Sequence, residues 1–230
     1  MKTAQDEAGI VGRGNREGAR LFREWFEELT RAAEEGRGGA YVFVMGSLGE
    51  LLRVFDLPVV FPEINSLQTA VRKVAHEYLN EAEDLGYSPD ICGYVKADVA
   101  TQKRGGQLPM GRIPKPSIAV LTNACNTYIK WAEIWERMYH MPSYVLDVPG
   151  SRADGLLPGR GDRDFENDRR YVTEQLRELI ALLEEVTGKR FDIDRLRETL
   201  GHANRMNAGW KRVLALNQSR PSLFNALSDG

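Results

Sequence analysis

The sequence predicts an α/β fold in which an open, mostly parallel sheet is covered by helices and followed by a helical segment. From residue 40 to residue 146, short apolar runs alternate with stretches of helical periodicity, which is typical of parallel strands joined by helices. The runs are apolar at consecutive positions, as expected for strands that are buried on both faces. After residue 150 only amphipathic helical patterns remain, so the sheet is expected to end there.

The expected elements follow one another in a regular order. A glycine-rich leader over residues 1–18, expected to be mobile, precedes a first helix between Leu21 and Leu29. Strands are expected at residues 40–45, 58–61, 91–95, 118–121 and 144–146. Helices are expected at residues 48–55, 67–79, 129–138 and 172–186, followed by a long helix or helix pair over 191–213.

These elements predict three regions. Residues 1–39 form the leader and first helix, residues 40–150 the α/β domain, and residues 151–230 a linker and helical segment. The linker is rich in glycine, proline and charge between residues 149 and 164. The chain trails off after Pro221 without a closing element, so we expect it to be part of a larger, multi-domain subunit.

Charge and hydropathy exclude several classes of protein. The 31 basic and 33 acidic residues leave a formal net charge of −2, which gives no support to nucleic acid or an anionic membrane as the main partner. No stretch approaches the roughly 20 apolar residues that a membrane-spanning helix needs. The first residues also lack the apolar run of a signal peptide. We therefore expect no membrane association and a cytoplasmic location.

The two cysteines are the residues with the clearest chemical potential. Cys125 follows a strong strand and begins a helix, and Cys92 lies beside a weaker strand candidate. Ligands of open α/β sheets bind at the carboxyl ends of strands, and a helix amino terminus favours the thiolate that a metal needs. However, free cysteine usually behaves as a small buried hydrophobe. A separation of 33 positions is no recognised ligand spacing, so spacing alone leaves both interpretations open.

The order of three longer segments resembles a known family. These segments are GSLGELLRVFDLPVVFPE (residues 46–63), EYLNEAEDLGYSPDICGYVKADVA (77–100) and PKPSIAVLTNACNTYIKWAEIWERMYHMPSYVLDVP (114–149). They resemble, in the same order, the opening motif and the first two cysteine segments of the benzoyl-CoA reductase/2-hydroxyacyl-CoA dehydratase family. Asn126 and Ala100 depart from the family pattern, which often has Asp and Gly there, and these departures leave the subfamily open.

The resemblance implies an iron–sulfur subunit. Family members are paired homologous subunits that each hold a cluster through three cysteines, and a separate ATP-dependent iron–sulfur activator supplies low-potential electrons. Carried over to this chain, the resemblance makes Cys92 and Cys125 ligands of a [4Fe–4S] cluster within residues 40–150. The family's third cysteine comes later in the chain, and no cysteine follows Cys125 here. The resemblance therefore also implies that this is the amino-terminal part of such a subunit.

Four further side chains are candidates for the same crevice. Glu50 and Glu63 are expected to flank it as catalytic carboxylates that position substrate or relay a proton. Their alternatives are a helix-dipole partner for Glu50 and an ordinary loop acid for Glu63. Ser47 and Asn123 stand at strand ends and can donate hydrogen bonds to a substrate thioester oxygen, although capping of the following helices is the favoured role.

The favoured function is a subunit of an enzyme that performs one-electron chemistry on an acyl-CoA thioester, as benzoyl-CoA reductase does. A 2-hydroxyacyl-CoA dehydratase subunit, which is a lyase, is the first alternative. A non-catalytic partner subunit and a flavodoxin-like small-molecule binding domain are the others. Trp131 and Trp135, four residues apart on a predicted helix, are expected in the core rather than in a substrate platform.

Overall fold

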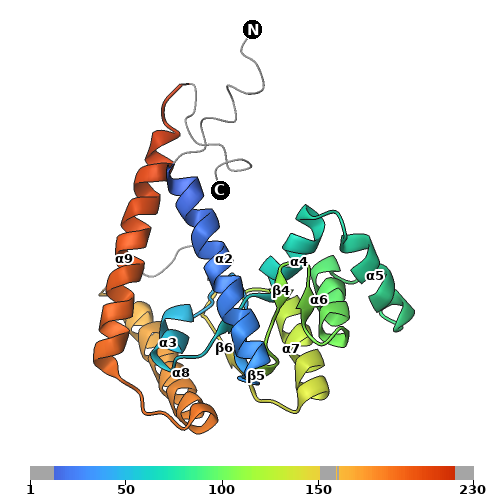
Figure 1. Cartoon of the computed structure of the whole chain (residues 1–230). Helices are drawn as coiled ribbons and strands as arrows, with labels where there is room; N and C mark the ends of the chain where they lie inside the picture. Colours follow the sequence, from blue (N-terminus) through green and yellow to red (C-terminus); the bar gives the residue numbers. More distant parts are fainter. Residues whose placement is uncertain (1–12, 151–158, 160, 221–230) are drawn as a thin grey trace.

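The computed structural model describes residues 13–150, 159 and 161–220, and it is an α/β fold (Figure 1). Four strands form one sheet in the order β2-β1-β5-β6, and every neighbouring pair is parallel. The strands are β1 (Gly39–Val42), β2 (Val59–Val60), β5 (Pro116–Thr122) and β6 (Ser143–Leu146). At the centre of the sheet, Tyr41 pairs with Val60 on one side and with Ala119 on the other.

Helices cover both faces of this sheet, as the alternating pattern predicts (Figure 1). They are α2 (Arg13–Glu34), α3 (Gly49–Val54), α4 (Pro62–Val71), α5 (Ala75–Asp84), α6 (Gly93–Lys103), α7 (Asn126–Tyr139), α8 (Arg163–Thr187) and α9 (Ile193–Leu216). Along β1, Tyr41 faces the core beneath α2, α6 and α7, whereas Ala40 and Val42 face the core beneath α3 and α8. Successive side chains of a strand point to opposite faces, so one central strand supplies both cores.

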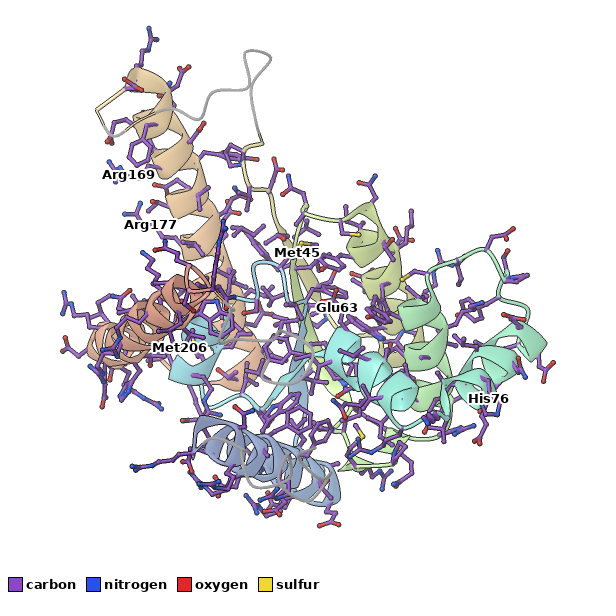
Figure 2. The ribbon with its side chains drawn as sticks, turned by 90° about the horizontal axis from the view of Figure 1, so that it is seen from above. Met45, Glu63, His76, Arg169, Arg177 and Met206 are labelled. Atoms are coloured by element: carbon purple, nitrogen blue, oxygen red, sulfur yellow. The ribbon has the colours of Figure 1, made fainter. Side chains whose placement is uncertain are left out.

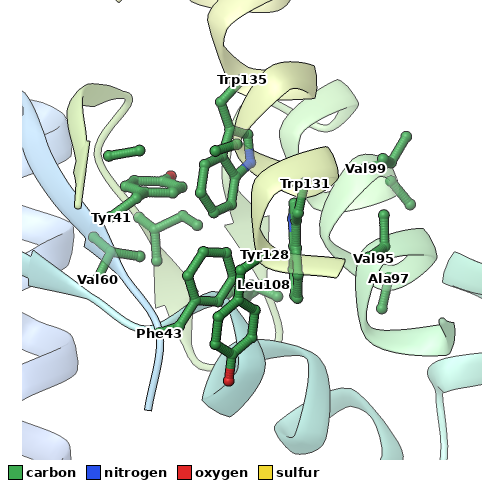
Figure 3. Packing of buried hydrophobic residues seen from close by; sticks show 14 of the residues in the cluster. Tyr41, Phe43, Val60, Val95, Ala97, Val99, Leu108, Tyr128, Trp131 and Trp135 are labelled. Atoms are coloured by element: carbon green, nitrogen blue, oxygen red, sulfur yellow. The ribbon is translucent and has the colours of Figure 1, made fainter. Parts of the chain in front are cut away.

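The first of these cores is dominated by aromatic rings (Figure 3). Phe43 stacks on Tyr128 with ring centroids 3.9 Å apart and also packs against Trp131 and Trp135. Both tryptophans are almost fully buried, which confirms the sequence expectation for them. Complete burial of one such side chain stabilises a fold by roughly 1.5–3 kcal/mol, so these rings hold α7 firmly on the sheet.

Two sequence expectations for the central region are wrong. Residues 91–95 form no strand, because the chain enters α6 at Gly93. This helix is buried from Val95 to Gln102, and a short apolar run of that kind has no periodicity that separates a buried helix from a strand. The expected helix over residues 67–79 is two helices, α4 and α5, separated at Lys73, whose φ of 60° ends the first.

Other boundaries differ more mildly. Helix α2 begins at Arg13, so the last residues of the expected leader are helical. Leu67 and Val71, which lie in the expected helix over residues 67–79, are exposed. A short hairpin of β3 (Gln107–Leu108) and β4 (Gly111–Arg112) was not expected. Residues 151–158, 160 and 221–230, where most of the linker and the trailing end were expected, lie outside the described residues. In the described part of the chain, no helix is both long and apolar enough to cross a membrane.

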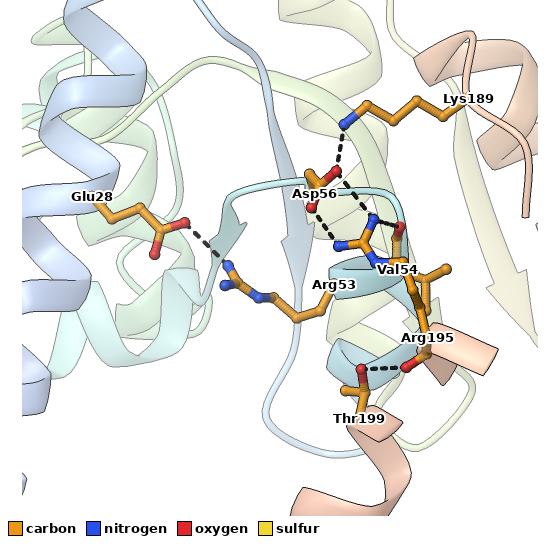
Figure 4. A network of polar contacts seen from close by, with 7 residues as sticks. All are labelled: Glu28, Arg53, Val54, Asp56, Lys189, Arg195 and Thr199. Atoms are coloured by element: carbon orange, nitrogen blue, oxygen red, sulfur yellow. Dashed lines mark hydrogen bonds and ion pairs between the residues drawn. The ribbon is translucent and has the colours of Figure 1, made fainter. Parts of the chain in front are cut away.

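A polar network attaches the last helix to the α/β core (Figure 4). Arg195 donates to the Asp56 carboxylate at 2.6 Å and to the carbonyl oxygen of Val54 at 2.8 Å. Lys189 donates to the second oxygen of the same carboxylate at 2.8 Å. Helix α9 has no fully buried residue. Its attachment therefore depends on this network and on half-buried side chains such as Leu196.

The first prediction concerns the charge of Asp56. The bonds from Arg195 and Lys189 hold the pKa of this carboxyl well below its ordinary value of 3.8. Replacement by Asn suits the positive φ of residue 56, so Asp56→Asn removes the charge with little backbone strain. We expect a loss of about 1 kcal/mol or less in unfolding free energy, since the pair is exposed to solvent.

The pH dependence of the unfolding free energy shows whether the Asp56 charge stabilises the fold. A carboxyl whose pKa is depressed in the fold contributes its full stabilisation above its ordinary value and loses it as pH falls. The difference between wild type and Asp56→Asn should therefore be constant near neutrality and shrink below about pH 4. Urea titrations at several pH values measure it. A difference that grows on acidification would contradict the network.

A second prediction concerns the close contact of Gly46 with Thr122. Gly46 has a φ of 75°, and a Cβ atom there would lie 2.6 Å from the Thr122 methyl carbon. Thr122 is buried and donates to the Met45 carbonyl at 3.1 Å, so it cannot move aside. Gly46→Ala should cost ~1–2 kcal/mol for the left-handed backbone and a further ~1–3 kcal/mol for overpacking.

Gly188→Ala is the matched control. Gly188 has a similar φ of 66° with no atom within 4 Å of the added Cβ. It should therefore show the backbone cost alone, which denaturant titration of both variants can measure. Equal losses of unfolding free energy in the two variants would mean that Thr122 moves aside for the new methyl group.

Candidate functional site

The carboxyl ends of the four parallel strands meet at one edge of the sheet, which we call the carboxyl edge. Strand β1 ends there in the loop that contains Ser47, β2 leads into Glu63, and β5 leads through Asn123 to Cys125. This convergence follows from strand direction alone, because all four strands run the same way. Ligands of open α/β sheets bind at this edge, so it is the candidate site.

Both cysteines occupy the residue immediately before a helix. Cys125 precedes α7 and is half-buried, and Cys92 precedes α6 and is exposed. The sequence predicted this position for Cys125, but it placed Cys92 beside a strand. Both cysteines therefore stand at a helix amino terminus, where the backbone N–H groups carry a partial positive charge.

Helices α6 and α7 run side by side in the same direction (Figure 3). Near their starts, the indole nitrogen of Trp131 donates to the Asp98 carboxylate at 2.7 Å. One turn further along α6 and two turns further along α7, the Tyr139 hydroxyl donates to Gln102 at 2.8 Å. The two bonded pairs follow one another in the same order along both helices, so the helices start at the same end. Cys92 and Cys125 therefore stand at the same end of this helix pair.

The segment that leads to Cys92 is held by a buried lysine. Lys96 donates to the Glu83 carboxylate at 2.6 Å and to the Pro89 carbonyl oxygen at 3.0 Å, with only 5% of its surface exposed. Ser66 of α4 also donates to the Tyr94 carbonyl oxygen at 2.9 Å. These bonds connect α4, α5 and the first turn of α6, so an exposed cysteine is carried by an ordered backbone.

Glu63 lies close to the start of α7. One of its carboxylate oxygens accepts a hydrogen bond from the Val44 backbone N–H at 2.6 Å, and the other accepts one from the Tyr128 hydroxyl at 2.9 Å. Tyr128 is three residues after Cys125, and burial together with the Glu63 carboxylate raises its pKa. Figure 2 shows Glu63 beside Met45, the residue after Val44. Glu63 therefore joins the β1 loop to α7 at the candidate site.

The other three predicted site residues have local roles in the structure. Ser47 accepts a bond from the Gly49 backbone N–H at 3.4 Å, at the start of α3. Glu50 is half-buried in the first turn of that helix, on the opposite face of the sheet from α7. The side-chain amide nitrogen of Asn123 donates to the Asp147 carboxylate and to the Val148 carbonyl oxygen. Its amide oxygen accepts a hydrogen bond from the Val148 backbone N–H. Asn123 thus connects the ends of β5 and β6, and it does not cap α7.

Sequence reasoning missed two residues that organise this site. Tyr128 could have been found as a hydroxyl one helical turn beyond Cys125. Asp98 could have been found as a single charge within the run from Val95 to Ala100. Burial raises the pKa of Asp98 to about 6, even though hydrogen bonds from Trp131, Gln102 and Trp135 oppose the shift.

Exposed apolar side chains lie in the β1 loop and in the helical turns that follow the two cysteines. Val44 and Met45 in the β1 loop are 55% and 51% exposed, and Tyr94 and Ile129 lie in the first turns of α6 and α7. Exposed apolar side chains that gather at one place typically mark a binding surface. The carboxyl edge therefore offers an apolar rim next to two thiols.

The two thiols supply part of the ligand set that an iron–sulfur cluster needs. Thiolates are the ligands that such clusters take, and both thiols of the chain lie at one end of a helix pair. A four-iron cluster normally takes four protein ligands, so these residues fit as part of a ligand set and further ligands must come from other groups. Among the described residues, no group of three His, Cys, Asp or Glu side chains is arranged to hold a metal ion.

Comparison with known proteins identifies the family. The family model for the 2-hydroxyglutaryl-CoA dehydratase D-component matches residues 44–229. A benzoyl-CoA reductase subunit of Thauera aromatica is 35% identical over 208 residues, which cover 89% of this chain and 46% of that protein. The alpha subunit of (R)-2-hydroxyisocaproyl-CoA dehydratase of Clostridioides difficile is 30% identical over 209 residues, covering 89% and 48%.

The chain spans about half the length of these relatives. The match begins in the β1 loop, covers the candidate site and extends through both C-terminal helices. It confirms the resemblance that the three sequence segments indicate. The chain belongs to the 2-hydroxyglutaryl-CoA dehydratase D-component family, which includes benzoyl-CoA reductase and 2-hydroxyacyl-CoA dehydratase subunits.

Proposed function

We propose that this chain is part of an enzyme subunit that performs benzoyl-CoA reductase-like chemistry on an acyl-CoA thioester, with Cys92 and Cys125 as two ligands of a [4Fe–4S] cluster. The observation that carries the proposal is the placement of both cysteines before parallel, adjacent helices. The named relatives support the substrate class, since each acts on an acyl-CoA. The remaining ligands, a homologous second subunit and an ATP-dependent iron–sulfur activator are further parts of the proposal.

The chain's own residues would hold the two thiolates in place and shield the inner side of the site from water. When bound, the cluster would supply low-potential one-electron transfer. The helix amino termini would stabilise the thiolates, and the aromatic core under Phe43 and Tyr128 would exclude water from the inner side. Glu63 holds the Tyr128 hydroxyl proton in a hydrogen bond, which fixes both side chains in the site.

We assign the contacts with substrate to the solvent-facing side of the candidate site. The apolar rim of Val44 and Met45 suits an apolar acyl group. We assign to the Ser47 hydroxyl, and to Asn123 in the complex, the donation of a hydrogen bond to the thioester oxygen. Glu50 is the second carboxylate and is assigned to proton relay from the far side of the β1 loop.

A 2-hydroxyacyl-CoA dehydratase subunit is the second candidate function. It is favoured by the family model and by the 30% identity to the (R)-2-hydroxyisocaproyl-CoA dehydratase alpha subunit. We rank the benzoyl-CoA reductase-like function first because the identity to the benzoyl-CoA reductase relative is higher, at 35%. Assay of the assembled enzyme with benzoyl-CoA and with a 2-hydroxyacyl-CoA separates the two, because only ring reduction consumes added reductant stoichiometrically.

The cluster is tested by anaerobic reconstitution of the chain with iron and sulfide. Iron, acid-labile sulfide and the electron paramagnetic resonance (EPR) spectrum are measured for wild type, Cys92→Ser and Cys125→Ser. We expect wild type to bind a cluster and either substitution to lower iron and sulfide strongly, since each removes one of only two thiolates.

Wild-type chain alkylated with iodoacetamide is the matched control, because it keeps the sequence and loses both thiolates. Its iron content defines adventitious binding. If wild type bound no more iron than the alkylated chain, or if both substitutions left the iron content unchanged, the assignment of Cys92 and Cys125 would be wrong.

Substitutions at Glu63 distinguish positioning from proton transfer. Glu63→Ala leaves the Val44 N–H and the Tyr128 hydroxyl without their acceptor, at a cost of about 1–3 kcal/mol in unfolding free energy. Glu63→Gln retains an amide oxygen for Val44 and should cost less. Turnover of the assembled enzyme completes the test. A Gln variant that is stable but inactive indicates proton relay, whereas one with near-normal turnover indicates that Glu63 only positions the loop.

A further inference from the structure

A buried carboxylate connects the two helices that carry the cysteines. One oxygen of Asp98 accepts hydrogen bonds from the indole nitrogens of Trp131 and Trp135, both at 2.7 Å. The other oxygen accepts from the side-chain amide of Gln102 at 2.8 Å. Asp98 is only 1% exposed. We call these four residues, together with Tyr139, the Asp98 clamp.

The clamp continues into the sheet. The oxygen of the Gln102 amide accepts from the Tyr139 hydroxyl at 2.8 Å, and its nitrogen also donates to the Tyr41 hydroxyl at 3.3 Å. Tyr41 donates in turn to the Pro114 carbonyl oxygen at 2.8 Å. These donors and acceptors match one another within an apolar core, and they join α6, α7, β1 and the segment before β5.

Apolar packing alone would leave the axial position of α6 against α7 weakly specified. Trp131 and Trp135 lie one helical turn apart, and their indole nitrogens converge on a single oxygen of Asp98. Sliding one helix by a turn, about 5.4 Å, would carry at least one indole away from this oxygen and remove a donor from a buried carboxylate. A buried ionised group is weak evidence for added stability, and its best-attested use is to fix register.

We propose that Asp98 is a positioning residue that sets the axial register of α6 against α7 and thereby the relative placement of Cys92 and Cys125. The functional meaning of this inference rests on the proposed function, but the placement itself does not. Asp98 lies six residues from Cys92, or about 9 Å along the helix axis. It therefore acts on the thiols through the helices and not by contact.

The chain offers a direct test because it contains only two cysteines. Nitroxide spin labels on Cys92 and Cys125 report their separation by dipolar EPR without any added mutation. Wild type should give one narrow distance distribution. Trp131→Phe keeps an aromatic ring but removes one donor, and Asp98→Leu keeps a similar side-chain volume but removes the acceptor of both indoles. In both variants the distribution should shift or broaden by at least the ~1.5 Å rise of one helical residue.

Two further variants make the test specific. Trp25→Phe also removes one indole donor, whose bond goes to the Val59 carbonyl at 3.0 Å outside the clamp, and it should leave the distribution unchanged. Asp98→Asn combined with Gln102→Glu exchanges the donor and the acceptor between the two positions. The amide oxygen introduced at position 98 can then accept from the indoles, and the amide nitrogen can donate to the carboxylate introduced at position 102. The double variant should therefore retain the narrow distribution, which Asp98→Leu loses.

The inference is overturned if Trp131→Phe and Asp98→Leu both unfold cooperatively, with the wild-type circular dichroism spectrum, and give the wild-type distribution. If Asp98→Leu does not fold, the more conservative Trp131→Phe decides. The measurement needs no iron. Failure of cluster reconstitution would therefore refute the proposed function and leave this result standing, whereas an unchanged distance with normal cluster content would refute only the role of Asp98.

Discussion

The parallel pairing of β1 with both β2 and β5 is the constraint on which the rest of this structure depends. Parallel strands cannot be joined by a tight turn, so each connection returns through a helix. As a result, every strand end, and the helix starts that follow β2 and β5, lie at the carboxyl edge of the sheet. The cysteine before α7, the Glu63 carboxylate and the β1 loop converge there for this reason.

The site also depends on how tightly its supporting layer is packed. Phe43 leaves the end of β1 and stacks on Tyr128, whose hydroxyl in turn bonds Glu63. The same aromatic layer contains the tryptophans that reach Asp98. The side chains at the candidate site and the side chains that orient them are thus parts of one core. Substitutions some distance from the thiols should consequently affect the site through packing.

Much of the fold could be predicted from the sequence, because doubly covered strands such as Ile118–Leu121 are apolar at every position. The prediction failed at residues 91–95, where a helix buried all round has no polar face to reveal its period. The two cysteines could be found from their segments, but their common placement could not. That placement depends on bonds between Asp98 and Trp131, residues 33 positions apart, and no local pattern predicts such a pair.

The strand order has a consequence for biosynthesis. Strand β1 pairs with β2 after a short connection, but its other neighbour, β5, begins only at Pro116. At ribosomal rates of about 5–20 residues per second, roughly 4–15 s separate the synthesis of the two strands. Throughout that interval one edge of β1 has no partner strand, with Tyr41 and Val42 beside open backbone groups. The nascent chain therefore exposes an unpaired strand edge, which can pair with another chain, until the segment that carries Cys125 has begun to emerge.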